Sequence, residues 1–163
     1  MIELRKITED NFDDVIELKV ASGQENFLSS NVYSLAEAYA NVINNEKPYM
    51  HFAIYNNDKV IGFAMIEFVE LDEDNFFNKN FGDKTGYYLF RFMIDEKHQG
   101  KGLGRQSLIK IIELLKSFPQ GKANLIAVSY ELSNEVVRKL YASLGFVETS
   151  LISDGDVFAR LGL

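Results

Sequence analysis

The feature that most constrains the fold lies in the middle of the chain. It is a dense apolar run followed by a glycine-rich turn and then by a long amphipathic segment. Residues 87–94 are apolar and aromatic enough for a buried central strand, and residues 99–104 place a glycine at every second position. From about 102 to 117 the apolar side chains recur at helical spacing, which predicts a helix with one buried face. A strand that enters such a helix through so short a turn requires a sheet on which the helix packs.

The second half of the chain continues this alternation of strand and helix. It predicts a strand at 123–129, a helix at 133–144, and two closing strands at 146–152 and 157–161. The order strand–helix–strand–helix–strand predicts one sheet with helices packed against it.

The first half of the chain predicts three strands and two helices. The expected strands are 3–7, 50–55 and 60–70, with a hairpin turn at 56–58. The expected helices are 10–20 and about 34–45, the second capped by Ser34 with Glu37 at the capping-box position. The acidic, asparagine-rich segment 71–83 lacks periodicity and is predicted to be a mobile loop. Because the sequence has no repeat, linker or low-complexity tract, we expect a single domain over residues 1–163.

The charge of the chain argues against nucleic acid as a partner. The sequence holds 17 Lys and Arg against 24 Asp and Glu, a net charge of −7. Such a field repels a phosphate backbone and raises the local concentration of cations. We therefore expect a small cationic partner rather than nucleic acid, although many proteins are acidic for solubility alone.

Cysteine and histidine usage narrows the chemistry further. Because the sequence has no cysteine, disulfides, thiolate zinc sites, iron–sulfur clusters and cysteine nucleophiles are excluded. The two histidines, His51 and His98, are well separated in the sequence, so no metal site is predicted. The N-terminal residues lack the apolar core of a signal peptide, and no stretch approaches about 18 uncharged apolar residues. We expect a cytoplasmic protein that does not span a membrane.

The turn at residues 99–104 predicts an anion-binding site. Alternate glycines let a ligand approach the main-chain amides, and the first N–H groups of the following helix lack partners within it. The helix dipole and three nearby cations, Lys97, Lys101 and Arg105, add to the attraction for an anion. A P-loop is excluded because no Gly-Lys pair is followed by Ser or Thr, and Arg105 stands where a dinucleotide fingerprint needs Gly or Ala. A turn without any ligand remains the alternative on these residues alone.

Two motifs give the chain a family resemblance. Residues 99–104, Gln-Gly-Lys-Gly-Leu-Gly, resemble the coenzyme A pyrophosphate loop of the GNAT superfamily of N-acetyltransferases. Residues 134–146 resemble its second motif, in which an Asn is followed by Leu-Tyr and then by Gly-Phe. Within the superfamily, the segments 60–65, 72–75 and 91–95 are most similar to the bacterial spermine/spermidine N-acetyltransferases.

The resemblance implies a fold class and a reaction. The fold class is α/β (α+β): a GNAT-like mixed, mostly antiparallel sheet of about six to seven strands, with helices on both faces and a splay between the fourth and fifth strands. The reaction is direct transfer of acetyl from acetyl-CoA, the co-substrate, to a primary amine, without a metal. The favoured acceptor is a polyamine or a similar small cation.

The resemblance also implies which residues contact the coenzyme. These are Phe92, Met93, Ile94, Gln99, Gly100, Lys101, Gly102, Leu103, Gly104, Arg105 and Asn134. The amides of the turn would hold the pyrophosphate, and the Gln99 side chain would support the turn. Unpaired amides of residues 92–94 would pair with the pantetheine arm, and an N–H of Phe92 or Met93 would stabilise the oxyanion. Asn134 would hydrogen-bond the pantetheine arm.

Proton transfer is assigned to Tyr141 and to a carboxylate. In the family the tyrosine that matches Tyr141 protonates the departing thiolate, which suits a phenol with a pKa of about 10 beside a thiol near about 8.5. A purely structural role for Tyr141 in an apolar stripe is the alternative. The amine needs a base, and Glu67 and Glu70 rank first because they lie near the end of the strand predicted beside the central one. The other acidic candidates are Glu25, Glu37, Asp72, Glu73 and Asp74.

Other activities and assemblies remain open at the level of sequence. The acceptor is alternatively a protein N-terminus, an amino acid or an aminoglycoside. The chain is alternatively a coenzyme A-binding sensor without catalysis. The oligomeric state is open, with a homodimer among the expected assemblies.

Overall fold

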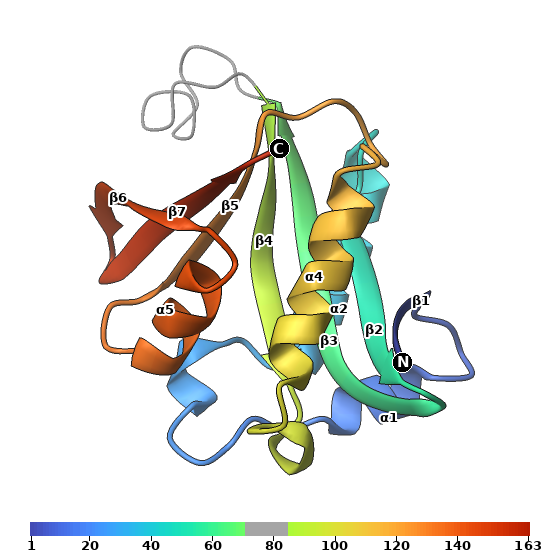
Figure 1. Cartoon of the computed structure of the whole chain (residues 1–163). Coiled ribbons are helices and arrows are strands. Elements are labelled where there is room, and N and C mark those ends of the chain that lie inside the picture. Colours follow the sequence, from blue (N-terminus) through green and yellow to red (C-terminus); the bar gives the residue numbers. More distant parts are fainter. Residues whose placement is uncertain (71–84) are drawn as a thin grey trace.

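Seven strands form one sheet in the computed structural model, which describes residues 1–70 and 85–163. The predicted loop at 71–83, with Asp72, Glu73 and Asp74, lies outside the described residues. The strands are β1 (Ile2–Lys6), β2 (Met50–Asn56), β3 (Lys59–Glu70), β4 (Thr85–Ile94), β5 (Leu125–Glu131), β6 (Val147–Ser153) and β7 (Asp156–Gly162). Their order is β1-β2-β3-β4-β5-β7-β6, and β4 and β5 are the parallel pair in an otherwise antiparallel sheet (Figure 1). The mixed, mostly antiparallel sheet confirms the expected fold class.

Helices cover both faces of this sheet, as predicted. They are α1 (Phe12–Glu17), α2 (Asn31–Asn44), α4 (Leu103–Leu115) and α5 (Glu135–Ala142), with short 3-10 helices η1 (Glu25–Phe27) and η2 (Glu96–His98). Figure 1 shows α4 in front of the sheet, while α1 and α2 lie behind it. None of the helices in the described part of the chain is long and apolar enough to cross a membrane.

Strand β3 contributes buried side chains to the cores on both faces of the sheet, because its side chains alternate between the two faces. Phe63 and Met65 are buried in the cluster that contains Val15 of α1, whereas Ile66 is buried in the cluster that contains Ile111 of α4. A strand covered on both faces has a nearly continuous apolar sequence. The strand expected at 60–70 is confirmed, with its first residue at Lys59.

The first helix is shorter than its sequence suggests. It ends at Glu17 rather than near Val20. The backbone N–H of Lys19 donates instead to Asp95 Oδ2 at 3.0 Å, so a contact with a residue distant in sequence replaces the last helical turn. This contact also joins the segment after α1 to the end of β4.

The second helix begins earlier than predicted. Its N-cap is Ser30, whose Oγ accepts from the N–H of Tyr33 at 3.2 Å. The predicted cap at Ser34 is wrong: Ser34 lies inside the helix, fully buried, and its hydroxyl donates to the Ser30 carbonyl at 3.0 Å. Glu37, expected in the capping box, contacts Arg91 of β4 at 3.4 Å instead.

The sheet is splayed between β4 and β5, as the family resemblance implies. These strands pair only where Gly86–Leu89 lies beside Leu125–Val128. Beyond that short ladder they diverge, and Figure 1 shows β5 leaning away from β4 toward β7. The parallel pairing therefore ends in the middle of β4.

A β-bulge accompanies the splay. On the other side of β4, Met65 pairs with Arg91 and Ile66 pairs with Leu89, so Phe90 is an extra residue in the ladder. A bulge bends its strand and increases the local twist. Residues 91–94 pair with β3 alone, and no described strand covers the opposite edge of residues 90–94.

Candidate active site

The divergence of β4 and β5 opens a cleft of about 700 Å³. Its walls come from both strands, from α5, from the glycine turn before α4 and from the segment around η1. The lining includes residues 26–29, 88–94, 99–100, 129–131, 136–137 and 140–141. A cleft of this size, lined by apolar groups and a few polar ones, is typical of a small-molecule site.

The glycine turn closes one end of this cleft with unsatisfied backbone donors. Gly100 and Gly102 have φ of +73° and +72°, left-handed conformations in which a side chain is strained. Gly102 is the N-cap of α4, and the first helical bond runs from the N–H of Gln106 to the Gly102 carbonyl at 3.2 Å. The three preceding amides, of residues 103–105, have no backbone acceptor among the described residues. Free amides of this kind at the N-terminus of a 13-residue helix favour an anion.

The Gln99 side chain braces this turn. Its Nε2 donates to the Ile94 carbonyl and to Gln24 Oε1, both at 2.9 Å. The turn is thus tied to the end of β4 and to the segment that follows α1.

Most of the coenzyme-binding residues expected from the resemblance are brought together in the cleft. Those that line it are Phe92, Met93, Ile94, Gln99, Gly100, Gly102, Gly104, Arg105 and Asn134. Lys101 and Leu103 do not line it, and the Lys101 ammonium instead donates to the Lys97 carbonyl at 2.7 Å. Arg105 is therefore the cation of the turn that lies against the cleft.

Asn134 begins α5 at the opposite wall. Its side-chain oxygen accepts from the N–H of Val137 at 3.3 Å, which makes it the N-cap of the helix. The cap holds the residue at the edge of the cleft.

Tyr141 is buried in the wall of the cleft and is 4% exposed. Its ring stacks on Tyr130 at 5.6 Å between centroids and packs on Phe146 at 5.2 Å. The turn after α5 supports this packing, because Gly145 has a φ of +90° and the N–H of Phe146 donates to the Tyr141 carbonyl at 3.2 Å. Burial raises the pKa of Tyr141 above its usual value, and neighbouring Tyr130 and Tyr88 raise it further. Among the described residues, no hydrogen-bond partner reaches its hydroxyl.

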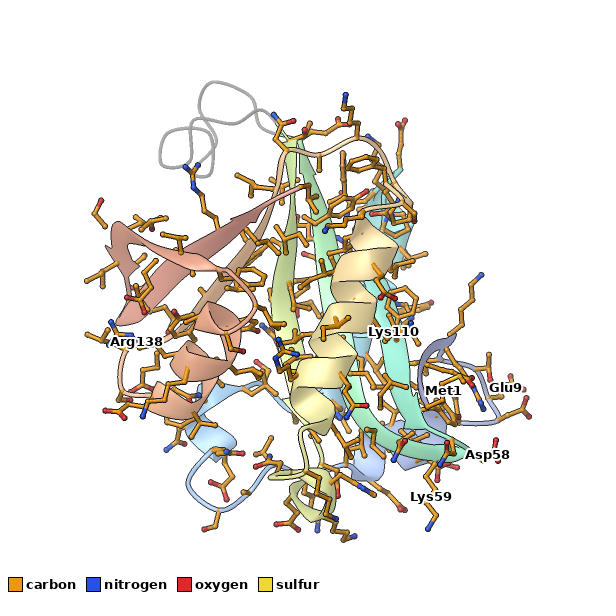
Figure 2. All side chains as sticks on the ribbon, in the orientation of Figure 1. Met1, Glu9, Asp58, Lys59, Lys110 and Arg138 are labelled. Atoms are coloured by element: carbon orange, nitrogen blue, oxygen red, sulfur yellow. The ribbon has the colours of Figure 1, made fainter. Side chains whose placement is uncertain are left out.

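Tyr130 is itself held from the far side by an ion pair. Its hydroxyl donates to Glu148 Oε1 at 2.9 Å, and Arg138 donates two hydrogen bonds to the same carboxylate at 2.6 and 2.8 Å. Figure 2 shows Arg138 on the outer side of α5, beside the β6–β7 edge. This network holds the ring on which Tyr141 stacks.

The two carboxylates ranked first as base do not line the cleft. Glu67 is half-buried on β3, opposite Tyr88 in register. Burial raises the pKa of Glu67, and the charge of Glu37 raises it further. Glu70 is exposed and forms an ion pair with Lys47. In the described ranges, no three histidine or carboxylate side chains are grouped as a metal site requires.

A hydrogen-bonded chain that sequence reasoning missed lies where β4 and β5 separate. The Tyr88 hydroxyl contacts Ser129 Oγ at 2.8 Å, and Ser129 Oγ donates to Asp156 Oδ2 at 3.1 Å. All three residues line the cleft. The registers of β5 with β4 and with β7 together bring these side chains into contact, and the sequence carries no local signal of either register.

The sequence matches known acetyltransferases over most of its length. The model of the acetyltransferase (GNAT) family matches residues 12–146. A spermine/spermidine N(1)-acetyltransferase of Bacillus subtilis (strain 168) is 31% identical over 147 residues, which cover 89% of this chain and 87% of that protein. A probable spermine N(1)-acetyltransferase of Bacillus subtilis subsp. natto (strain BEST195) is 31% identical with the same coverage.

Solved structures share the fold at low identity. The aminoglycoside acetyltransferase AAC(6')-Ib in complex with coenzyme A has a TM-score of 0.76 and 20% identity, with 99% of this chain and 95% of that chain covered. The PaiA N-acetyltransferase from Thermoplasma acidophilum in complex with coenzyme A has a TM-score of 0.68 and 15% identity, with 100% and 99% covered. These matches identify the splayed sheet as an acetyltransferase fold.

The family match, on a fold that solved acetyltransferases share, therefore defines the class of protein as an acyltransferase. The chain belongs to the GNAT family of acetyltransferases and is an N-acetyltransferase. Acetyl-CoA is the co-substrate that family membership implies.

Proposed function

We propose that this protein transfers the acetyl group of acetyl-CoA directly to a primary amine of a small cationic acceptor such as a polyamine. The observation that carries the proposal is the cleft between β4 and β5, which has free helix amides at one end and Tyr141 in its wall. This arrangement offers an anion site and a proton donor along one continuous surface.

The donor side of the cleft fits acetyl-CoA. The amides of residues 103–105 and the left-handed glycines before them would hold the pyrophosphate, with Arg105 adding a full positive charge. The edge of residues 90–94 has no described strand partner, so an extended pantetheine arm can pair with it as an added strand. Asn134 would hydrogen-bond this arm from the opposite wall.

Two groups of this chain would stabilise the transition state. A backbone N–H of Phe92 or Met93 donates to the thioester oxygen as negative charge develops there. The Tyr141 hydroxyl donates its proton to the departing thiolate. Because burial raises the pKa of Tyr141, the phenol keeps this proton at neutral pH.

A polyamine acceptor is supported by charge and by the relatives. The chain carries a net charge of −7, which raises the concentration of polycations near it. The curated relatives at 31% identity are named for spermine and spermidine. Of the two carboxylates ranked first, Glu67 fits the acceptor side better, because it lies beside Tyr88 whereas Glu70 is paired with Lys47.

A panel of acceptors tests the proposal. Thiol release from acetyl-CoA is measured with spermidine, an aminoglycoside, a free amino acid and a short peptide. We expect the highest kcat/KM with spermidine. Turnover with the peptide but not with spermidine would overturn the acceptor class, and binding of acetyl-CoA without turnover of any amine would identify a sensor.

A further inference from the structure

An amine that attacks a thioester must lose a proton, and the cleft needs a group to take it. An alkyl ammonium has a pKa of about 10.4 in water, so its neutral form is scarce near neutral pH. Glu67 and Glu70 lie outside the cleft lining, whereas the chain Tyr88–Ser129–Asp156 lies in it. This chain crosses three neighbouring strands at the end of the β4–β5 ladder.

The direction of the hydrogen bonds in this chain follows from what each group can donate. An ionised carboxylate only accepts, so the single hydrogen of Ser129 is directed to Asp156. Ser129 must then accept at its 2.8 Å contact with the phenol, and the Tyr88 hydroxyl is the donor there. A phenol oxygen that donates its hydrogen can still accept one from an ammonium or amine N–H.

From this geometry we propose that Tyr88, Ser129 and Asp156 form a relay that accepts the proton of the acceptor amine, with Tyr88 as the catalytic residue that contacts the amine. Ser129 and Asp156 are positioning residues that act through Tyr88. The inference rests on the proposed N-acetyl transfer and adds the group that receives the proton.

Each hydrogen in the relay moves by one bond. Before attack, an N–H bond of the ammonium breaks, its hydrogen joins the Tyr88 oxygen, and the electron pair left on nitrogen then forms the C–N bond. The second proton that nitrogen loses after attack balances the proton that Tyr141 gives to the thiolate. The former Tyr88 hydrogen passes to Ser129, and the former Ser129 hydrogen passes to Asp156. Nitrogen loses its positive charge, Asp156 becomes neutral, and nothing is oxidised or reduced. Asp156 is partly exposed, so it can release the proton to solvent.

The electrostatic surroundings suit a transient charge on Tyr88. Among the residues that the structure describes, the charged groups that act on it are Asp156 on β7, Arg91 on β4 and Glu67 on β3. Burial raises the pKa of Tyr88 and the bond with Ser129 lowers it, so the phenol remains protonated at rest. The charge of an ionised Tyr88 also raises the pKa of Tyr141. One cleft therefore holds a phenol for the amine and another phenol for the thiolate.

Three substitutions interrupt the relay at different points. They are Tyr88→Phe, Ser129→Ala and Asp156→Asn, and the last keeps the acceptor for the serine hydrogen. Ser129→Thr restores a hydroxyl at the middle position, and Asp154→Asn is the matched control, an exposed acid two positions from Asp156. Thermal unfolding and calorimetric binding of acetyl-CoA establish that each variant folds and holds its co-substrate.

We expect each interrupted variant to lose about 100-fold in kcat/KM for spermidine at about pH 7, the scale of a lost general base. The loss should shrink to below about tenfold at about pH 9.5, where solution supplies more neutral amine. Ser129→Thr and Asp154→Asn should stay within about threefold of the wild type. Combining Ser129→Ala with Asp156→Asn should be no worse than either alone, because one break stops the relay.

Two results would overturn the relay. One is wild-type kcat/KM in any folded interrupted variant at neutral pH, and the other is a loss of equal size at both pH values. Wild-type protein that acetylates no amine would instead overturn the proposed function, so the two failures are distinguishable.

Discussion

Removing the Tyr141 hydroxyl should lower turnover without lowering the stability of the fold. In Tyr141→Phe the ring contacts with Tyr130 and Phe146 are retained, at 5.6 and 5.2 Å between centroids. The hydroxyl has no hydrogen-bond partner among the described residues, so its removal breaks no hydrogen bond there and leaves no protein group unpaired. We therefore expect the free energy of unfolding to stay within about 1 kcal/mol of wild type or to rise.

The catalytic effect should be large in comparison. Loss of a general acid lowers turnover by about 100-fold, or about 2.7 kcal/mol of transition-state stabilisation. Because burial raises the pKa of Tyr141, wild-type kcat should show no alkaline decline from this group below about pH 10. Urea unfolding, thiol-release kinetics and calorimetry with acetyl-CoA measure the three quantities.

Tyr87→Phe is the matched control because it should give the opposite result. Tyr87 is fully buried outside the cleft, and its hydroxyl donates to the Gly121 carbonyl at 2.7 Å. Its removal should cost about 1 kcal/mol of stability with kcat unchanged. Wild-type kcat in Tyr141→Phe, with acetyl-CoA still bound, would refute the general-acid assignment and leave Tyr141 as core.

Two further predictions concern stability. Gly62→Ala should destabilise by about 1–3 kcal/mol, or roughly 2–4 °C in Tm per kcal/mol, since its Cβ would lie 2.4 Å from the Met93 carbonyl oxygen. Gly104→Ala, whose Cβ would lie 3.7 Å from its nearest neighbours, should not lower Tm, and equal melting of both variants would contradict this. Burial and the bond to Glu148 raise the pKa of Tyr130 to about 12. The protonated phenol therefore contributes fully to the free energy of unfolding below about pH 10, and this contribution is lost as pH rises toward 12. The free energy of unfolding, measured by urea titration from neutral to alkaline pH, should therefore fall more steeply for wild type than for Tyr130→Phe. Parallel curves would exclude this linkage.

The parts of the site that depend on local sequence could be predicted. Alternate glycines predicted a turn before the helix, and in the turn Gly100 and Gly102 have positive φ. The helix predicted at 133–144 placed Asn134 near its start, and in the structure Asn134 caps α5. These conformations are set within a few residues of each position, so no tertiary information is needed to infer them.

The cap of α2 shows why local patterns fail elsewhere. The pair Ser34 and Glu37 has the spacing of a capping box, whereas Ser30 is followed by Tyr33 at the corresponding position. Ser30 caps the helix nonetheless, and Glu37 contacts Arg91, which is 54 residues away. A tertiary contact thus occupies the carboxylate that the local pattern would use.

The relay was beyond prediction for the same reason. Its members belong to β4, β5 and β7, and they meet only through the register of two ladders and the point at which one of them ends. A shift of one residue in either register would turn a side chain to the other face of the sheet. Residue types alone do not determine such a register.

The distribution of charge is compatible with both proposed substrates, the polyanionic acetyl-CoA and a polycationic amine, at one cleft of an acidic protein. The amides before α4 attract phosphate through partial charges of about half a unit rather than through many cationic side chains. Lys101 is turned onto the Lys97 carbonyl, which leaves Arg105 as the cation of the turn in the cleft lining. The net charge of −7 already includes the cations of this turn, so the chain as a whole still favours the proposed polyamine acceptor. In the proposed function, backbone donors rather than lysines hold the phosphates, and the acidic surface is left to the amine.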